Sequence, residues 1–387
     1  MGVLLLAGAA LINDGWVDRH FLPDFHQARA IYRIWETAGR IMLALIGLTM
    51  VLALRPVLGR LAARRSLREI FVSAAPMLVA LLMALVVTEL VLRSTYWRIA
   101  NEAPASPEPR MQADPKLGWT FVPSRAAHAR VGGRVVDYAF DSRGYRVPRV
   151  GDSPDPEKPT VVFAGESILV GYGLQWDESV PAKVQAQTGL QAANAAVAGY
   201  STDQVYMRLA TELPRFRRPV AVVMLFTPSL FAKNLSQNRP HLGPGLEWRP
   251  ARKPLRLEAI AIHALPYHSQ LAVDRGVAET RAVLKAGVDL ARARGAAPMI
   301  VCPVFGDGEP MERDLRRRIL DEGGLPYVLV RLDPSWRVPG DGHPDARGAT
   351  EIAAAIARRL AMSASSPAVQ THLSNQAHID QDRAGAT

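Results

Sequence analysis

The sequence has a single cysteine, Cys302, among 387 residues. A lone thiol excludes an intramolecular disulfide and any metal or iron–sulfur site built from several thiolates. The sequence has no internal repeat and no nucleic-acid recognition motif, although its formal net charge is +10. Charged residues amount to only 21% and hydrophobic residues to 49%. This composition excludes a mostly disordered chain. Because no recognition motif is found, we predict no nucleic-acid partner.

Long apolar runs gather near the N-terminus. Ile70 to Thr88 contains 19 consecutive uncharged residues, which span about 28 Å as a helix, roughly the hydrocarbon core of a bilayer. Ile41 to Leu54 is shorter but flanked by arginines that can reach the interface, and Val3 to Ile12 is too short to cross alone. We therefore predict a membrane region at 1–95 with two to three transmembrane helices. A buried hairpin of a soluble protein is the alternative.

The link between the second and third apolar runs is rich in arginine. Glu69 alone opposes its five arginines, which are Arg55, Arg60, Arg64, Arg65 and Arg68. The positive-inside rule places such a link in the cytoplasm. We therefore predict a protein of the inner membrane, with the lipid bilayer as a partner. The part after the third helix then faces the periplasm or the outside.

Beyond the membrane region, the composition and the pattern of apolar residues change. Residues 96–157 are predicted as a linker and a small β-rich segment, with β-type runs at Trp119–Val122 and Arg134–Phe140. Residues 158–362 alternate apolar strand candidates with helical stretches, which predicts an α/β domain with a parallel sheet covered on both faces. The polar, aperiodic residues 363–387 are predicted to be a disordered tail. The strand candidates are Thr160–Ala164, Gln191–Ala196, Val220–Phe226, Ala297–Val301 and Tyr327–Leu332.

Reactive side chains follow these strand candidates, where ligands bind in such sheets. The first strand runs into Gly165-Glu166-Ser167, so Ser167 can present a nucleophile together with a free backbone N–H. A helix N-cap is the ordinary alternative for this serine. Gly199 follows the second strand and is either a loop glycine or a backbone donor close to substrate.

A second cluster precedes the last helix. The sequence Gly340-Asp341-Gly342-His343-Pro344 offers His343 as a general base and Asp341 as the acid that orients it. The alternative is a Pro-Gly-Asp-Gly turn with an incidental exposed histidine.

Taken in order, these pieces resemble the SGNH/GDSL hydrolase superfamily over about 160–360. The resemblance implies a three-layer, flavodoxin-like parallel sheet preceded here by transmembrane helices. Ser167 matches the nucleophile of the first block, in which Glu166 replaces the usual Asp. Gly199 matches the oxyanion-hole glycine, and His343 matches the base. Upstream, Leu117-Gly118-Trp119 and Asp141-Ser142-Arg143-Gly144-Tyr145-Arg146 look like the membrane-tethered bacterial branch.

Two departures from the family pattern stand out. The third block of the family places an oxyanion-binding Asn where this chain has Ser229, so Ser229 or the later Asn234 is the candidate substitute. The catalytic Asp of the family sits three residues before the His, which is Gly340 here. Asp341, two residues before His343, is the nearest acid.

The resemblance implies a serine esterase that forms an acyl-enzyme without a metal or cofactor. Its expected substrates are small esters or ester-linked acyl groups on cell-surface or exported glycans, with exopolysaccharide assembly proteins as possible partners. One alternative is a polysaccharide O-acyltransferase that passes the acyl group to a sugar hydroxyl. Another is a catalytically weakened glycan-binding or assembly subunit, which the Ser229 departure favours and the presence of Ser167 and His343 disfavours.

The orientation can be tested with reporter fusions. Alkaline phosphatase, which is active only outside the cytoplasm, should be active when fused after residue 100 and inactive when fused at residue 62. The reason is the arginine-rich link between the second and third apolar runs. The reverse pattern of activity would overturn both the orientation and an external substrate.

Overall fold

The computed structural model describes residues 2–23, 25, 29–54, 59, 66–94, 109, 111–236, 238–252, 254–264 and 266–364. The chain divides into two compact units. Unit 1 consists of Met1–Glu102 and Arg252–Arg275, and unit 2 consists of Ala103–Ala251 and Gly276–Thr387. Most of the predicted linker, all but the first two residues of the tail predicted at 363–387, and all the arginines of the arginine-rich link except Arg68 lie outside the described residues.

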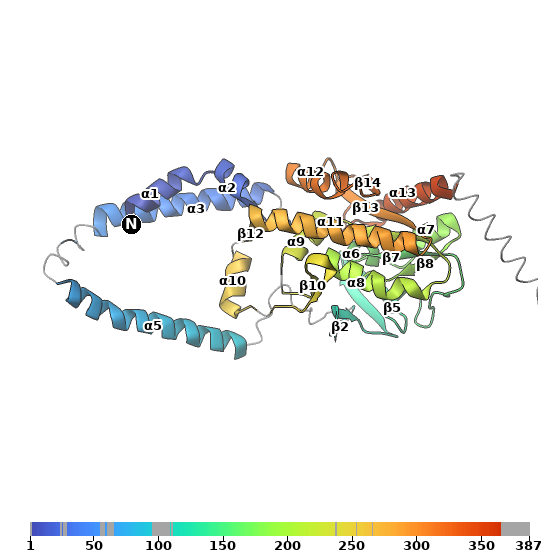
Figure 1. Cartoon of the computed structure of the whole chain (residues 1–387), viewed down its shortest axis with the longest axis horizontal. Coiled ribbons are helices and arrows are strands. Elements are labelled where there is room, and N and C mark those ends of the chain that lie inside the picture. The colour runs from blue at the N-terminus through green and yellow to red at the C-terminus, as the bar shows by residue number, and fades with distance from the viewer. Residues whose placement is uncertain are drawn as a thin grey trace, which may run out of the picture. The chain divides into compact units, whose positions relative to one another are not determined.

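Unit 2 is built on one eight-stranded sheet with the order β14-β13-β9-β7-β8-β6-β5-β4 (Figure 1). Its first five members are parallel to one another. Numbered along the chain, these five strands stand in the order 2-1-3-4-5, which is the flavodoxin-like arrangement. The predicted fold class is thereby confirmed. The five are β7 (Thr160–Ala164), β8 (Gln191–Asn194), β9 (Pro219–Leu225), β13 (Ala297–Phe305) and β14 (Tyr327–Leu332).

Three antiparallel strands extend the sheet beyond β8, namely β4 (Ala126–Val131), β5 (Arg134–Phe140) and β6 (Arg146–Val147). The sequence predicted a small sheet or hairpin of their own for this segment. Instead, Arg146 of β6 pairs with Asn194 of β8, which joins the hairpin β4–β5 to the main sheet. Only β2 (Met111–Asp114) and β3 (Gly118–Phe121) form a separate two-stranded sheet there.

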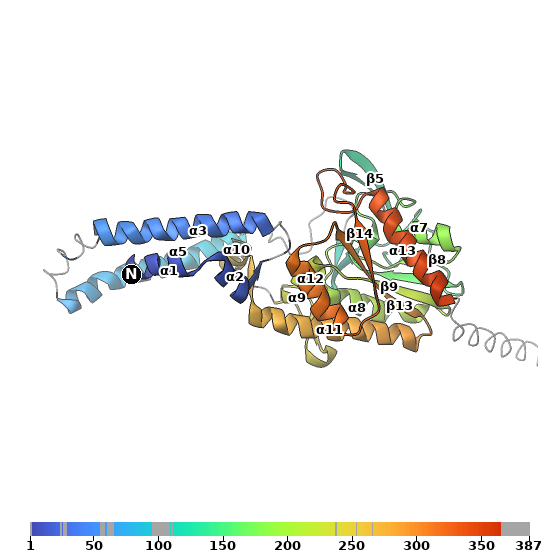
Figure 2. The ribbon, with the colours of Figure 1, turned by 90° about the horizontal axis from the view of Figure 1, so that it is seen from above.

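Helices cover both faces of the parallel part (Figure 2). One face carries α7 (Val180–Thr188) and α13 (Ala346–Ala364), and the other carries α8 (Thr202–Glu212), α9 (Pro228–Leu235) and α11 (Gln270–Ala293). A shorter helix, α12 (Pro310–Arg316), connects β13 to β14. The strands between the layers are buried on both sides, as in β7, where all five residues are buried. This explains why the strands are almost continuously apolar in sequence.

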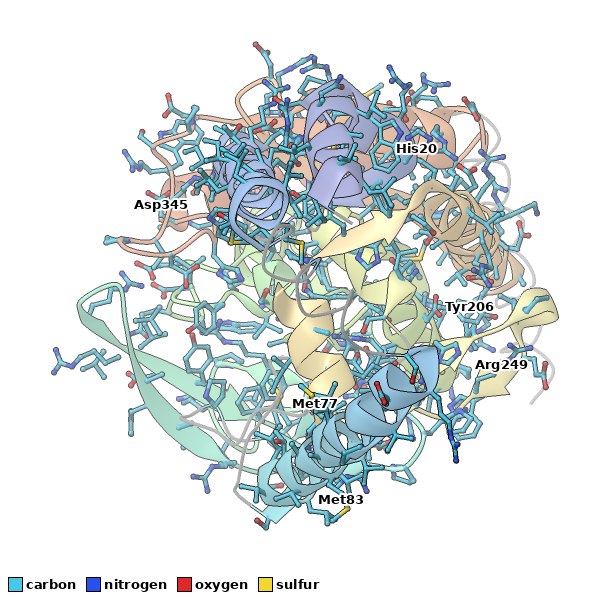
Figure 3. All side chains as sticks on the ribbon, turned by 90° about the vertical axis from the view of Figure 1, so that its left-hand side faces the viewer. His20, Met77, Met83, Tyr206, Arg249 and Asp345 are labelled. Atoms are coloured by element: carbon cyan, nitrogen blue, oxygen red, sulfur yellow. The ribbon has the colours of Figure 1, made fainter. Side chains whose placement is uncertain are left out.

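Unit 1 contains two helices long and apolar enough to cross a membrane, at Arg29–Ala53 and Ala75–Ser94. The first comprises α3 (Arg29–Thr49) and a π-helical turn (Met50–Leu54), and it begins 12 residues before the predicted Ile41. The second lies in α5 (Leu67–Ser94), where Met77 and Met83 are 74% and 60% exposed (Figure 3). Apolar side chains left bare along a helix are what a bilayer accommodates.

The third apolar run is α1 (Gly2–Leu11), which packs on α3. The two helices approach closely because Gly2 and Gly47 have no side chains. A Cβ on Gly47 would lie 2.9 Å from the carbonyl oxygen of Gly2. Small residues at a helix contact are typical of membrane helix pairs. A short helix, α2 (Asp14–His20), and the strand β1 (Phe21–Pro23) connect α1 to α3.

The segment 252–275 groups with unit 1, whereas the sequence assigned all of 158–362 to a single domain. Its strand β12 (Tyr267–Ser269) pairs with β1, and its helix α10 (Arg256–Ala264) packs on α5. The Glu89 carboxylate accepts hydrogen bonds from the N–H groups of Arg256 and Leu257, each at 2.9 Å, and thus caps α10. These partners lie more than 160 residues apart, so no local pattern indicates them.

In unit 2, the buried Asp203 of α8 makes the stability of the fold depend on pH. Its Oδ2 accepts a 2.8 Å hydrogen bond from Leu242 N, and its Oδ1 has no partner among the described residues. Burial raises the pKa of Asp203 to about 7 because the interior disfavours the charged carboxylate. The folded state therefore binds more protons than the unfolded state above the ordinary pKa of Asp, so the free energy of unfolding falls as the pH rises toward 7.

Asp203→Asn mimics the neutral acid and should remove this dependence. We expect the free energy of unfolding of the variant to approach that of wild type near pH 4 and to exceed it by about 1–4 kcal/mol near pH 8. Denaturant unfolding of the full chain in detergent at the two pH values measures the difference. Asp289→Asn, at an exposed position on α11, is the matched control and should show little change. A constant difference at both pH values would contradict the assignment.

Candidate active site

Ser167 stands at the carboxyl end of the central strand β7. It is the first residue of α6 (Ser167–Val170), a single helical turn whose N-cap position belongs to Glu166. An N-cap role for Ser167 is therefore excluded. The first N–H groups of a helix have no partner within it, and the N–H of Ser167 has none among the described residues. Ser167 thus presents a hydroxyl and a free backbone donor side by side.

The turn after Ser167 is fixed by Arg146, one of the largest fully buried side chains. Its guanidinium donates to the carbonyl oxygens of Val170, Gly171 and Leu174 at 2.6, 2.7 and 2.5 Å. Burial lowers the pKa of Arg146 to about 10, so it remains protonated at neutral pH. Gly171 ends α6 with φ +79°, and a Cβ there would meet Arg146 Nη1 at 2.7 Å. Only glycine fits this position.

His343 reaches Ser167 from the loop that follows β14. Its Nε2 lies 2.7 Å from Ser167 Oγ, and its Nδ1 is hydrogen-bonded to Asp341 Oδ1. The side chains of His343 and Asp341 are each 28% exposed, so the cluster is open to a ligand. The structure therefore brings together Ser167, His343 and Asp341, which the sequence predicted as catalytic residues.

A tight turn explains how an acid only two residues before the histidine can reach the imidazole. Asp341 N donates to Val338 O, and Val338 N donates to His343 O, both at 2.9 Å. Gly340 adopts φ +73° within this turn. Asp341 Oδ1 also accepts a 2.9 Å hydrogen bond from His343 N, which holds the carboxylate beside its own loop. The turn thus lets an acid two residues before His343 reach the imidazole.

The charge state of Asp341 follows from two opposing effects. Burial raises its pKa, but the hydrogen bonds from His343 lower it by more, and the net pKa lies below the ordinary value. The carboxylate is therefore ionised and accepts a hydrogen bond from the Nδ1–H group of His343, which leaves Nε2 to face Ser167. The Tyr172 ring packs 4.8 Å from the His343 ring. Burial and the charge of Asp341 raise the pKa of Tyr172, which keeps it a neutral phenol.

Gly199 lies on the loop after β8, next to the Ser167 segment. Ala195 N donates to Phe163 O and Val197 N to Gly165 O at 3.0 and 3.1 Å, so this loop runs alongside the end of β7. Gly199 adopts φ +80°, and among the described residues its N–H has no hydrogen-bond partner. Its N–H and that of Ser167 are thus two free backbone donors on neighbouring loops.

Two large side chains donate hydrogen bonds to carbonyl oxygens of the Gly199 loop. Trp119 Nε1 donates to Ala198 O at 3.1 Å, and Arg239 Nη1 donates to Gly199 O at 2.7 Å. The Arg239 guanidinium also lies 5.6 Å from the centre of the Trp119 ring. Trp119 belongs to β3, so the small sheet β2–β3 supports the loop that carries the second free N–H.

The two candidates for the missing asparagine donor have different surroundings. Ser229 lies in the first turn of α9, which begins after β9, the strand next to β7. Asn234 uses both ends of its amide elsewhere. Its Oδ1 accepts from Asp203 N at 3.3 Å, and its Nδ2 donates to Thr280 Oγ1 at 2.9 Å. Asn234 thus ties α9 to α8 and α11, and both polar ends of its amide have partners other than the Ser167 segment.

Glu166, which precedes the serine, forms an ion pair with Lys233 of α9. The side chain of Glu166 is 6% exposed and that of Lys233 is 17% exposed, so each charge depends on the other. Sequence reasoning did not single out Lys233, Arg239 or Tyr172, because nothing local distinguishes them from ordinary surface residues. Within the described ranges, no group of three or more His, Cys, Asp or Glu side chains could hold a metal ion.

The coupling between Glu166 and Lys233 can be measured with a double-mutant cycle. Glu166→Gln and Lys233→Met should each lower the free energy of unfolding by about 1–3 kcal/mol, because each leaves a mostly buried charge unpaired. The double variant should lose less than the sum of the two single losses. Denaturant unfolding of the four proteins gives the coupling energy. Strictly additive losses would show that the two charges do not interact.

The comparisons with known proteins return structures but no sequence family. No protein-family model matches this chain, and no curated protein matches it. One similar structure is a GDSL-like lipase from Bacteroides thetaiotaomicron VPI-5482, with 14% identity over 55% of this chain and 92% of the lipase at a TM-score of 0.33.

Two further similar structures are described as carbohydrate esterases. A carbohydrate acetylesterase family member from Sinorhizobium meliloti has 14% identity over 52% of this chain and 97% of its own, at a TM-score of 0.33. An acetyl xylan esterase from Butyrivibrio proteoclasticus has 9% identity over 54% and 65%, at a TM-score of 0.35. At these identities and TM-scores the similarity assigns no activity to this chain.

Proposed function

We propose that unit 2 is a serine esterase. The observation that carries this proposal is the hydrogen-bonded series formed by Ser167 Oγ, the His343 imidazole and the Asp341 carboxylate. A hydroxyl 2.7 Å from a ring nitrogen, with the other ring nitrogen bound to a carboxylate, is the geometry of an activated serine nucleophile. The free N–H groups of Ser167 and Gly199 supply donors for the oxyanion.

In the acylation step, His343 Nε2 takes the proton of Ser167 Oγ while Oγ forms a bond to the ester carbonyl carbon. The negative charge that develops on the carbonyl oxygen is stabilised by the backbone N–H groups of Ser167 and Gly199. The ester C–O bond then breaks, and the departing alkoxide receives the proton from His343. Asp341 stays ionised and stabilises the imidazolium that exists between these two transfers.

In the deacylation step, water replaces the released alcohol. His343 removes a proton from the water while the water oxygen attacks the acyl carbon of the acyl-enzyme. The tetrahedral intermediate collapses when the bond to Ser167 Oγ breaks and Oγ regains a proton from His343. The products are a carboxylic acid and the free enzyme.

The altered third block bears on the rate. Losing one oxyanion donor lowers the rate by about 10²–10³-fold in enzymes where this has been tested. With Ser229 at the position of that asparagine, the proposed oxyanion site has only the two backbone donors of Ser167 and Gly199. We therefore propose an enzyme that is slow on simple esters.

For the substrate we propose an acyl group carried by a cell-surface or exported glycan. Two features support this choice. Unit 1 has two helices able to cross a membrane, and the arginine-rich link predicts that unit 2 faces outward. A tethered esterase on that side meets glycans in transit or already at the surface. Exopolysaccharide assembly proteins are then proposed as partners.

Covalent labelling tests the proposed function directly. A fluorophosphonate should label the full chain at Ser167, and Ser167→Ala should abolish both labelling and turnover of a short-chain aryl ester. Asp341→Asn should lower kcat by about 10²–10⁴-fold because the imidazole loses its orienting charge. Ser363→Ala, near the end of α13, is the matched control and should label like wild type. Folded wild-type protein that neither labels nor hydrolyses any short-chain ester would refute an esterase.

A further inference from the structure

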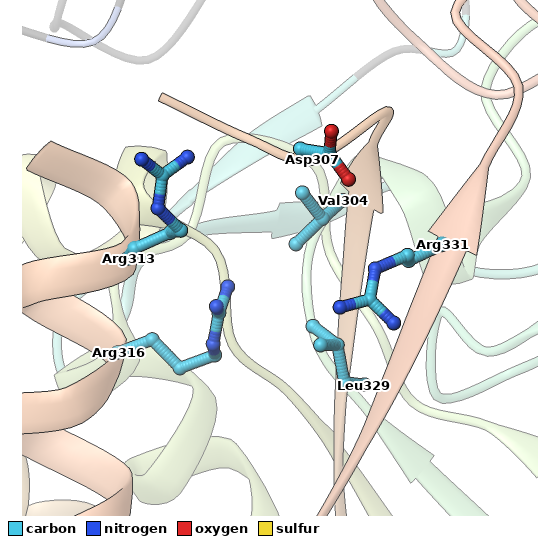
Figure 4. A pocket seen from close by; sticks show the side chains of 6 residues that line it. All are labelled: Val304, Asp307, Arg313, Arg316, Leu329 and Arg331. Atoms are coloured by element: carbon cyan, nitrogen blue, oxygen red, sulfur yellow. The ribbon is translucent and has the colours of Figure 1, made fainter. Parts of the chain in front are cut away.

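A cavity lined by arginines lies apart from the residues of the proposed mechanism. It has a volume of about 370 Å³ and lies between α12 and the last two strands of the sheet (Figure 4). Such a volume is within the range of small-ligand pockets. Its lining residues are Val304, Asp307, Arg313, Arg316, Leu329 and Arg331.

The three guanidinium groups come from two different elements. Arg313 and Arg316 extend from α12, and Arg331 extends from β14 toward the same space (Figure 4). An arginine on an edge strand can serve to prevent edge-to-edge pairing, which would account for Arg331 alone. It does not account for two helix arginines that line the same cavity.

The lining of this cavity carries a net positive charge, with three arginines against one acid. Among the described residues, no carboxylate lies within ion-pair distance of Arg313, Arg316 or Arg331, whereas the adjacent Arg317 is paired with both Asp314 and Glu322. Arg313 Nη1 donates only to a carbonyl oxygen, that of Gly308, at 2.6 Å.

The remaining groups near the cavity do not compensate for three cations. Asp307 is the one acid in the lining. Glu312 of α12 does not line the cavity, and its Oε2 accepts a 3.0 Å hydrogen bond from Glu309 N. Burial raises the pKa of the neighbouring Cys302 to about 12, so its thiol is neutral. Three like charges around one opening repel one another, and a bound anion relieves that repulsion.

The chemistry of the lining defines the ligand. Planar guanidinium groups bind carboxylate and phosphate oxygens in pairs of parallel hydrogen bonds. Val304 and Leu329 add an apolar floor on β13 and β14, which suits the carbon skeleton that carries the anionic group. The ligand is therefore an organic molecule with a carboxylate or phosphate group.

The cavity lies at the same end of the sheet as Ser167. Asp307 lies two residues after the end of β13, and Arg331 is the penultimate residue of β14, so the cavity opens near the carboxyl ends of these strands. In the sheet, β9 and β13 lie between β7 and β14. At about 4.8 Å per strand spacing, the distance from β7 to β14 is therefore roughly 10–15 Å. A chain of a few sugar units extends over such a distance.

We propose that this arginine cavity binds the anionic group of a glycan whose acyl ester is hydrolysed at Ser167. The proposal rests on the proposed esterase function for its link to catalysis, but anion binding stands independently of it. The substrate class is thereby an acidic glycan, with a carboxylate or a phosphate on a sugar near the acylated one.

Equilibrium binding to the full chain in detergent tests the cavity itself. The probes are trigalacturonate, inorganic phosphate and the neutral xylotriose. We expect trigalacturonate or phosphate to bind at least about tenfold more tightly than xylotriose, with affinity falling as salt increases. The anion that binds more tightly identifies the carboxylate or the phosphate source. The Arg316→Gln/Arg331→Gln double variant should lose at least about tenfold in affinity, while Arg317→Gln, outside the cavity, should bind as wild type does.

Rates of ester hydrolysis distinguish a failure of the anion-binding proposal from a failure of the proposed esterase function. For the double variant, the loss of kcat/KM on acetylated oligogalacturonide should exceed the loss on a neutral aryl ester by at least about tenfold, mainly through KM. Equal losses on both esters, or unchanged anion affinity in a double variant that melts like wild type, would overturn the arginine cavity as a binding site. If the protein binds the anions but hydrolyses no ester, the cavity remains an anion-binding site and the proposed esterase function is refuted.

Discussion

The arrangement around Ser167 depends on a buried arginine placed between an added strand and the nucleophile turn. Arg146 pairs with Asn194 across β6 and β8, and both side chains donate into the same short helix. Asn194 Nδ2 donates to Leu169 O at 2.9 Å, while Arg146 donates to the carbonyls of Val170, Gly171 and Leu174. Removing a guanidinium from water is costly unless its donors are satisfied. The carbonyls satisfy the two Nη groups, while the buried Nε has no hydrogen-bond partner among the described residues. The short helix that begins with Ser167 thereby gains a fixed end.

Each further part of the site is held by a partner from a distant element. The Gly199 loop is supported by Trp119 from β3 and by Arg239, which follows α9. Glu166 is held by Lys233, and the His343 ring is packed against Tyr172. Two backbone donors and one Ser–His–Asp series are thereby fixed by contacts outside the reacting groups. Such support matters because an oxyanion donor acts fully only when it is placed before the charge develops.

The two cationic regions of unit 2 differ in a way that the sequence cannot show. Arg146 and Arg239 are buried and donate to backbone carbonyls, so their charge serves the fold. Arg313, Arg316 and Arg331 line an open cavity without an ion-pair partner among the described residues, so their charge faces outward. In the sequence all five are simply arginines. Their roles differ because burial and neighbouring groups, not residue type, decide whether a guanidinium is bound by the backbone or faces an open cavity.

The sequence by itself determined the five parallel strands, the apolar helices and the positions of Ser167, Gly199 and His343, because these depend on local periodicity and on which residues follow a strand. Only the tertiary structure decided that β4–β6 extend the main sheet and that 252–275 joins unit 1. The tertiary structure also showed that the amide of Asn234 is hydrogen-bonded to Thr280. It showed in addition that Asp341 contacts the imidazole of His343. These outcomes rest on pairings between residues far apart in the chain or on the detailed path of one turn. Local sequence patterns carry no information about either, because both are set by how the packed elements satisfy one another's hydrogen bonds.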